Sequence, residues 1–205
     1  MFRMTCLAAA TAFVASSAQA ALIGVNSLSL YQSFVGGQAF QDQSIDLNAF
    51  GVGVVTSPLQ GVTGGTAWSA SANDGLYLGT LTSGTRFLST FAANRELTIS
   101  FDGAGVMAFG ANTFLTNDGD QVIAGNVLMR LSDGTTFAGT VGSESSFYGW
   151  VSEGDVTITS VTYRPFLSGT GSFASLSDLR FALIPSSGAM AILALGGFVA
   201  VRSRP

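Results

Sequence analysis

The sequence has 205 residues, of which 47% are hydrophobic and 10% are charged, and its formal net charge is −4. It contains no histidine and no lysine, and its single cysteine is Cys6. This composition excludes the Ser-His-Asp triad, the Cys-His pair, the usual zinc sites and Schiff-base lysine chemistry. Carboxylates, tyrosine, serine and arginine are the groups left for a functional site.

The first twenty residues have the order of an export signal. Arg3 precedes the apolar run Cys6–Val14, and Ala18-Gln19-Ala20 supplies the small residues that signal peptidase requires. We therefore expect residues 1–20 to be a signal peptide and signal peptidase to be a partner. Because Cys6 lies in the segment to be removed, the mature chain is expected to have no disulfide and to depend on a packed core.

Residues 21–182 are long enough for one domain with its own core. They carry twelve acidic residues and five arginines, which gives this segment a net charge of −7. A chain this acidic, with no basic patch, is a poor candidate for binding nucleic acid or an anionic membrane surface. We expect no nucleic-acid partner.

The pattern of this segment is that of short strands. In its first half, Leu22–Phe34 and Ile45–Val55 are expected strands, and Ser57–Thr66 is expected to be flexible. Farther on, apolar and polar residues alternate, so that one face of each strand is apolar. This alternation occurs in Leu97–Phe101, Val127–Leu131, Val156–Tyr163 and Leu179–Phe181.

Turn signals separate these strands at short intervals. They are Asn73-Asp74-Gly75, Asp102-Gly103, Asn117–Asp120, Ser132-Asp133-Gly134 and Glu153-Gly154-Asp155. Short strands joined by such turns are typical of a sandwich or barrel. We predict an all-β, jelly-roll-like antiparallel β-sandwich over residues 21–182.

The Asn117-Asp118-Gly119-Asp120 turn has a metal-binding and a purely structural interpretation. Oxygen-bearing side chains recur there, so Asp118 and Asp120 are candidate ligands of a structural calcium ion, the one cofactor that we consider. The turn lacks the full spacing of an EF-hand loop, however, and Asn-Asp-Gly is also an ordinary hairpin turn. Both interpretations stay open, and the turn is favoured because it needs only the local sequence.

Aromatic side chains suggest a second kind of site. The set consists of Trp68, Tyr77, Phe147, Tyr148, Trp150 and Tyr163. Such rings either fill the core of a sandwich or, when exposed, stack on sugars. Since Tyr148 and Trp150 alternate with Phe147 and Gly149, one pair is expected to face outward. Tyr148 and Trp150 are therefore the candidate sugar-binding residues.

Four carboxylates are the only candidates for catalysis. Asp133, Glu144, Glu153 and Asp155 can in principle supply an acid and a nucleophile for glycoside hydrolysis. Each lies in an expected turn, where carboxylates are commonly solvated, and the sequence does not show that any two converge. We expect no catalytic residues and no enzyme activity.

The C-terminus carries an apolar segment that ends in arginine. Pro185 leads into Gly188–Val201, and Arg202 and Arg204 follow. A helix buried in the core would show a polar face, which this segment lacks, so a membrane helix is favoured. Its fourteen residues span about 21 Å, less than a bilayer core of about 30 Å, and snorkelling arginines narrow that difference. The arginines are expected to stay on the cytoplasmic side.

The order of proline, apolar helix and arginine end in residues 183–205 resembles the PEP-CTERM sorting tail of exported bacterial proteins. The resemblance implies recognition by an exosortase-type membrane enzyme, with Pro185, Gly188, Arg202 and Arg204 as the sorting motif. It also implies export, anchoring in the membrane through the C-terminal helix, and then a place at the cell surface or outside the cell.

A second resemblance spans about half of the chain. Segments such as Asp74–Leu78, Phe109–Asn112, Leu131–Thr135 and Ser146–Val151 are similar to the β-sandwich ectodomains often attached to PEP-CTERM tails. That resemblance implies no transferable catalytic motif. We expect a structural or adhesive protein of the cell surface or extracellular matrix, with a carbohydrate-binding module, and hence an extracellular polysaccharide partner, as the main alternative. A glycoside hydrolase is the third possibility.

Overall fold

The structure is a computed structural model that describes residues 21–103, 105–154, 156–167, 169 and 171–184. The predicted signal peptide and the sorting residues Pro185, Gly188, Arg202 and Arg204 lie outside this range. Within the described residues, no helix is long and apolar enough to cross a membrane.

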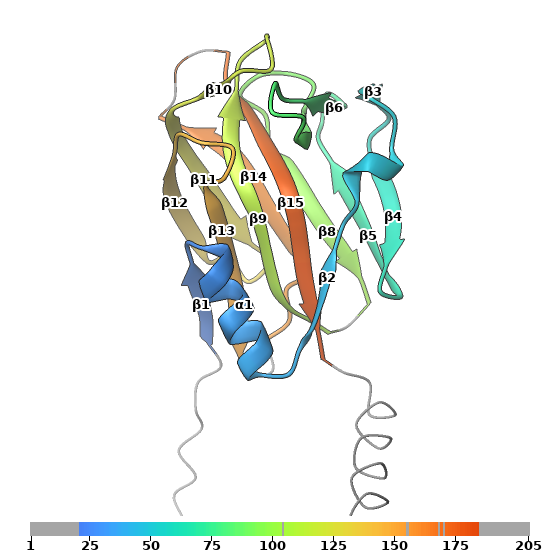
Figure 1. Ribbon diagram of the computed structural model, residues 1–205, viewed down its shortest axis with the longest axis vertical. Helices are drawn as coiled ribbons and strands as arrows, with labels where there is room; N and C mark the ends of the chain where they lie inside the picture. The colour runs from blue at the N-terminus through green and yellow to red at the C-terminus, as the bar shows by residue number, and fades with distance from the viewer. Residues whose placement is uncertain (1–20, 104, 155, 168, 170, 185–205) are drawn as a thin grey trace, which may run out of the picture.

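Two antiparallel sheets pack face to face (Figure 1). In the described part, nine strands form the first sheet and six form the second. The first has the order β1 (Ala21–Val25), β13 (Phe147–Glu153), β9 (Val106–Thr116), β15 (Phe173–Leu183), β7 (Arg86–Thr90), β6 (Leu76–Thr80) and β3 (Gly53–Val55), with β10 (Val122–Ile123) paired to β9 and β2 (Gln41–Ser44) paired to β15. The second has the order β12 (Thr136–Val141), β11 (Gly125–Leu131), β14 (Ser160–Phe166), β8 (Leu97–Asp102), β5 (Thr66–Ser71) and β4 (Leu59–Thr63). The predicted all-β antiparallel sandwich is confirmed.

The main core lies between the two sheets. Leu97, Ile99 and Phe101 of β8 are buried there, as the alternation in the sequence predicts. From the first sheet, Phe109 and Phe181 face them, and the ring of Phe101 lies 5.6 Å from that of Phe109 and 5.2 Å from that of Phe181 between centroids. Large apolar side chains on the inward faces of both sheets therefore hold the sandwich together.

The predicted strand Leu22–Phe34 is wrong in its second half. The structure has β1 at its start and then helix α1 (Leu28–Gly37), which begins where the Ser27 hydroxyl accepts a hydrogen bond from the Leu30 amide at 3.2 Å. Tyr31 and Val35, four residues apart, lie on its buried face against the outer side of the first sheet. The helix thus covers part of a face that the sequence pattern left open (Figure 1).

Two other expectations for the first half of the chain need correction. Ile45–Val55 is not one strand, because Asp46 caps a short 3-10 helix, η1 (Leu47–Ala49), before β3 begins. The segment Ser57–Thr66, which we expected to be flexible, contains β4, which pairs with β5 along its whole length. Glycine in β4 is required for packing, since a Cβ at Gly61 would lie 2.5 Å from the Trp68 ring.

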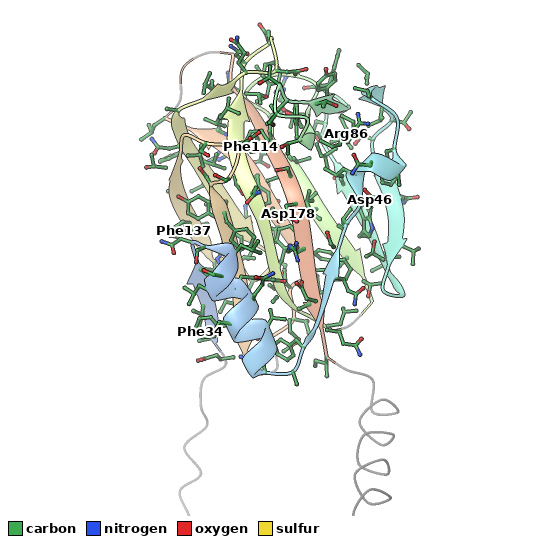
Figure 2. All side chains as sticks on the ribbon, in the orientation of Figure 1. Phe34, Asp46, Arg86, Phe114, Phe137 and Asp178 are labelled. Atoms are coloured by element: carbon green, nitrogen blue, oxygen red, sulfur yellow. The ribbon has the colours of Figure 1, made fainter. Side chains whose placement is uncertain are left out.

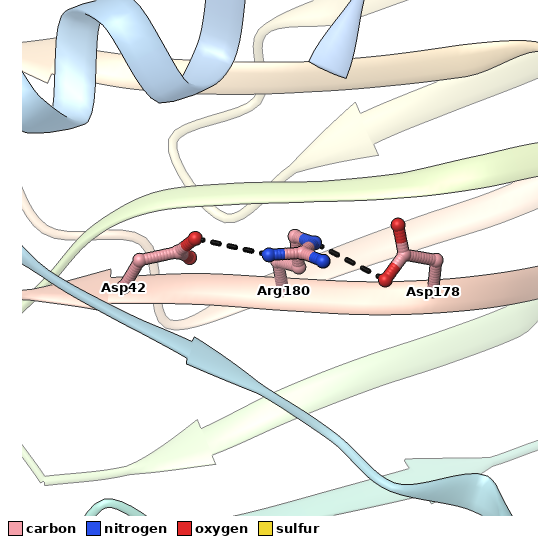
Figure 3. Close-up of polar contacts among 3 residues, drawn as sticks. All are labelled: Asp42, Asp178 and Arg180. Carbon is pink, nitrogen blue, oxygen red and sulfur yellow. Dashed lines mark hydrogen bonds and ion pairs between the residues drawn. The ribbon is translucent and has the colours of Figure 1, made fainter. Parts of the chain in front are cut away.

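The long strand β15 has a different neighbour at each end. Its first half pairs with β7 and its last residues pair with β2, and a bulge with Asp178 at φ +46° separates the two parts. Arg180 lies just after the bulge and bridges Asp178 (Nε–Oδ1 3.1 Å) and Asp42 of β2 (Nη1–Oδ2 3.2 Å), as Figure 3 shows. Because all three side chains are only partly exposed, this ion pairing helps to hold β2 against β15.

Candidate functional site

A hollow of about 260 Å³ opens at the end of the first sheet where β9 turns into β10, and we call it the β9–β10 hollow. Segments far apart in the sequence meet there: β6, the end of β7, the start of β15 and the Asn117–Gln121 turn. Its lining consists of Tyr77, Ser89, Thr90, Phe91, Thr116, Asn117, Asp118, Asp120 and Phe173. The hollow therefore combines aromatic rings with carboxylates, an amide and hydroxyls.

Three aromatic residues form the apolar part of this lining. Phe91 is 52% exposed, and Tyr77 and Phe173 are partly exposed. The Tyr77 ring is held from behind by a small apolar cluster, in which Phe87 packs edge-on against Tyr77 at 6.1 Å and against Phe114 at 5.9 Å between centroids. Figure 2 shows Phe114 in this upper part of the sheet. Packing of this kind fixes a ring before a ligand arrives.

A hydrogen bond links the aromatic and acidic parts of the hollow. The Tyr77 hydroxyl donates to Oδ2 of Asp120 at 2.9 Å. This bond, with a smaller effect of burial, raises the pKa of Tyr77 above its ordinary value, so the phenol stays protonated as a donor at neutral pH. Asp120 itself has φ +58°, a conformation that side-chain hydrogen bonding and turn geometry can support in aspartate.

The predicted calcium turn has the hydrogen bonding of a structural turn. Oδ1 of Asn117 accepts from the backbone amides of Gly119 and Gln121, each at 3.0 Å. Within the described residues there is no group of three or more His, Cys, Asp or Glu side chains that could hold a metal ion. Asp118 and Asp120 do lie in one hollow, and calcium binding there stays a prediction.

Hydroxyl groups make a rigid floor beneath the hollow. Ser175 donates to the Ser89 hydroxyl at 3.0 Å and lies 3.0 Å from the Thr116 hydroxyl. The Ser89 hydroxyl in turn donates to the carbonyl oxygen of Ala174 at 3.1 Å. All three hydroxyl residues are buried, and they join β7, β15 and β9 side by side. These bonds keep the floor in one arrangement.

The structure does not expose Trp150, so the predicted Tyr148–Trp150 platform needs correction. Trp150 is only 3% exposed and belongs to the core between the sheets. The other side of β13 is not open either, because α1 covers it and the Tyr31 ring packs edge-on against Phe147 at 5.6 Å. The expectation that one pair faces solvent was wrong because it did not include a helix over the outer face.

Tyr148 lies at the margin of the sandwich. Its ring packs over Gly139 and beside Phe137 of β12, and its hydroxyl donates to the Thr140 carbonyl oxygen at 2.8 Å. Together with Trp150 and Asn26, Tyr148 and Phe137 line a second hollow of about 210 Å³. Figure 2 shows Phe137 at this edge. This hollow has rings but no charged residue in its lining, so it offers fewer groups to a polar ligand.

Three of the four candidate catalytic carboxylates lie among the described residues, each in a different turn or strand end. Asp133 accepts hydrogen bonds from the Thr135 amide and hydroxyl, both at 2.8 Å, within its own turn. Glu144 accepts from the Ser83 hydroxyl at 2.6 Å, and Glu153 is exposed at the end of β13. Asp155 lies outside the described residues.

The sequence indicated some of the residues that line the β9–β10 hollow but not others. Tyr77, Asp118 and Asp120 were each singled out, but in two unrelated hypotheses, and the structure brings them into one hollow. Phe91 and Phe173 were missed. Both are single phenylalanines next to strand ends, and only the pairing of β7 with β15 places them near the Asn117–Gln121 turn.

No protein-family model matches this sequence, and none of the curated proteins matches it. Solved structures with some likeness include a CBM6 module from Clostridium stercorarium in complex with cellobiose, at 14% identity and a TM-score of 0.33, which covers 72% of this chain and 95% of that one. A family 29 carbohydrate-binding module has 10% identity and a TM-score of 0.35, covering 64% of this chain and 88% of that one. A family 43 arabinoxylan arabinofuranohydrolase from Bacillus subtilis has 16% identity and a TM-score of 0.33, covering 57% of this chain and 25% of that one. The structural neighbours are thus mainly carbohydrate-binding modules, but TM-scores this low carry no argument about what this chain does.

Proposed function

We propose that this protein is exported and binds carbohydrate at the β9–β10 hollow, as a structural or adhesive component of the cell surface or extracellular matrix. One observation carries the binding proposal. The partly exposed rings of Phe91 and Tyr77 line the same hollow as the carboxylate of Asp120, to which Tyr77 is bonded.

The chemistry of these groups suits a sugar. A partly exposed ring can cover the apolar face of a pyranose, and this removes apolar surface from water. Carboxylate and amide oxygens accept hydrogen bonds from sugar hydroxyls, and the Asn117 amide can also donate. Because the ring of Tyr77 and the floor beneath it are already fixed by bonds within the protein, little ordering is required on binding.

The same groups favour binding over catalysis. Hydrolysis of a glycoside requires two carboxylates placed across the bond, one of them free to give a proton. In the β9–β10 hollow, Oδ2 of Asp120 already accepts a hydrogen bond from the Tyr77 hydroxyl, so this oxygen is engaged within the protein. We therefore place a non-catalytic role first.

The export part of the proposal rests on the two chain ends. Residues 1–20 act in it as the signal peptide, and residues 183–205 as a sorting tail with a membrane helix for an exosortase-type enzyme. In this proposal the sandwich is jelly-roll-like, faces outward and meets extracellular polysaccharide. The excess of acidic over basic residues in the sandwich is consistent with our expectation of no nucleic-acid partner.

The binding proposal predicts a loss of glycan retention on mutation. Affinity electrophoresis through gels containing a neutral glucan, a xylan or a mannan should show retarded migration with at least one of them. Phe91→Ala should weaken retention about tenfold, because an aromatic stacking contact contributes roughly 0.5–1.5 kcal/mol in addition to the apolar surface that it buries, and about 1.4 kcal/mol corresponds to a factor of ten. Asp120→Asn keeps an oxygen for Tyr77 but removes the charge, and it should weaken retention by a smaller factor. Chelator added to the gel also tests the predicted calcium.

Phe137→Ala is the matched control, because it removes a phenyl ring that is 41% exposed at the other hollow. It should leave retention unchanged. If Phe137→Ala abolishes retention and Phe91→Ala does not, the site is the hollow beside Tyr148. If no gel retards the wild-type protein, the carbohydrate proposal is wrong.

The export proposal predicts that the tail is what holds the protein to the membrane. A chain that ends at residue 185 keeps all of β15 and should be recovered in the soluble fraction with the melting temperature of the sandwich. A deletion from residue 183 is less suitable, because Leu183 pairs with both Gln41 and Val106. Full-length protein that fractionates as soluble with its tail intact would contradict the anchoring proposal.

A further inference from the structure

A further hollow, of about 420 Å³ and distinct from the one beside Tyr148, adjoins the β9–β10 hollow and shares Asp120 with it. We call it the three-turn hollow, because it is built from the β6–β7, β9–β10 and β12–β13 turns. Ser83, Gln121 and Glu144 come from these three turns and line it. The two hollows therefore lie on either side of one carboxylate, at one end of the sandwich.

The three-turn hollow is held together by a contact between distant parts of the chain. The Ser83 hydroxyl donates to Oε2 of Glu144 at 2.6 Å, although the two residues are 61 positions apart. Ser83 is also bonded to Thr85 within its own turn, its hydroxyl lying 2.9 Å from that of Thr85. A site assembled in this way from three loops is typical of binding surfaces on a rigid β scaffold.

We propose that the two hollows together form one groove that binds the interior of a neutral polysaccharide chain, with Asp120 between successive sugar units. This inference rests on the proposed function, because it extends the same site. The β9–β10 hollow supplies the rings on which one unit stacks. The three-turn hollow has no aromatic lining and supplies hydrogen-bonding groups to the next units.

Charge decides the chemical class of the chain. Asp118, Asp120 and Glu144 line the two hollows, and none of the described residues that line them is arginine. The protein has no lysine or histidine to supply a positive charge elsewhere in the groove. Uronate or sulfate groups would therefore meet only like charge, which disfavours an acidic polymer. A neutral chain carries hydroxyls that the carboxylates can accept from.

The length of the ligand provides the test. Calorimetric titration of the full protein would use the monosaccharide and oligosaccharides of two to six units, made from whichever neutral polysaccharide retards the protein in gels. The affinity should rise about tenfold or more from the shortest ligand to the longest, because the three-turn hollow adds hydrogen bonds to the longer ones. Glu144→Gln, with Ser83→Ala as a second variant, should remove this increase and leave the affinity for the monosaccharide, which occupies only the β9–β10 hollow, unchanged. A carboxylated polymer of the same backbone type should bind at least tenfold more weakly than the neutral one.

Several results would overturn the groove and leave the simpler binding proposal intact. These are equal affinity at all lengths, an equal loss for short and long ligands with both Glu144→Gln and Ser83→Ala, or equal binding of the carboxylated polymer. Failure of the proposed function looks different, since Phe91→Ala would then leave binding unchanged at every length. Circular dichroism melting of each variant shows whether a loss of binding comes from a loss of fold.

Discussion

Replacing Trp150 with alanine should lower the free energy of unfolding by about 3–5 kcal/mol, the usual cost of removing a large aromatic side chain from a core. Trp150 is 3% exposed and lies in the core beside Phe109 of the neighbouring strand β9. Whole domains of this kind are stabilised by only about 5–15 kcal/mol. Denaturant unfolding followed by circular dichroism should therefore show a much lower midpoint.

Phe137→Ala serves as the control for this measurement. Phe137 is 41% exposed, so Phe137→Ala removes less buried apolar surface than Trp150→Ala does. It should lower the free energy of unfolding by about 1 kcal/mol. Trp150→Ala unfolding at the same denaturant concentration as the wild-type protein would contradict the core placement. It would bring back an exposed tryptophan as a candidate for sugar stacking.

Alkaline pH should unfold the protein because of two buried tyrosines. Tyr31 and Tyr163 are fully buried, and neither hydroxyl has a hydrogen-bond partner in the described structure. Burial raises the pKa of both, and at Tyr31 the nearby Asp42 adds to the effect. The folded state therefore keeps its protons while the unfolded chain loses them above about pH 10.

The direction of this pH effect follows from the linkage between proton binding and folding. This contribution to stability is complete below the unfolded pKa of about 10 and is lost as the pH rises toward the folded value. Each tyrosine that stays protonated in the folded state lowers the free energy of unfolding by about 1.4 kcal/mol for every pH unit above 10. The phenolate absorbance of these two residues should appear together with the loss of the β-type circular dichroism signal.

The double variant Tyr31→Phe with Tyr163→Phe tests this cause. It keeps both rings and removes both ionisable groups, so the base-induced midpoint should move to higher pH. At neutral pH the variant should be no less stable than the wild type, because each hydroxyl is buried without a partner. An unchanged alkaline midpoint would show that other groups cause the unfolding.

The strands could be predicted from sequence where one face is buried and the other is polar. Leu97–Phe101 is such a case, since its alternation follows from a core on one side and solvent on the other. The expectation that one face of β13 is exposed to solvent was wrong, because the core covers its inner face and α1 lies over its outer face. The helix has only ten residues and glycine at its end, and its formation depends on packing against the sheet that no local pattern records.

The candidate site shows the same limit. Asp118 and Asp120 were visible as an acidic turn, and Tyr77 as one aromatic residue among several. Their meeting depends on which strands pair, since β6 reaches β9 only through β7 and β15. Phe91 carried no signal, because a single exposed phenylalanine after a strand has no periodicity. Long-range pairing, rather than local propensity, sets the composition of the hollow.

The strand β15 also sets the distance between the site and the end of the sandwich. Phe173, its first residue, lines the β9–β10 hollow, and Leu183, its last, lies at the opposite end beside β2 (Figure 1). The ten steps between the first and last of these eleven residues, at about 3.3 Å each, put the two points roughly 33 Å apart. A bilayer that held the segment after residue 184 would lie at the end of the sandwich opposite the β9–β10 hollow. In that case the proposed binding end of the sandwich would point away from the membrane.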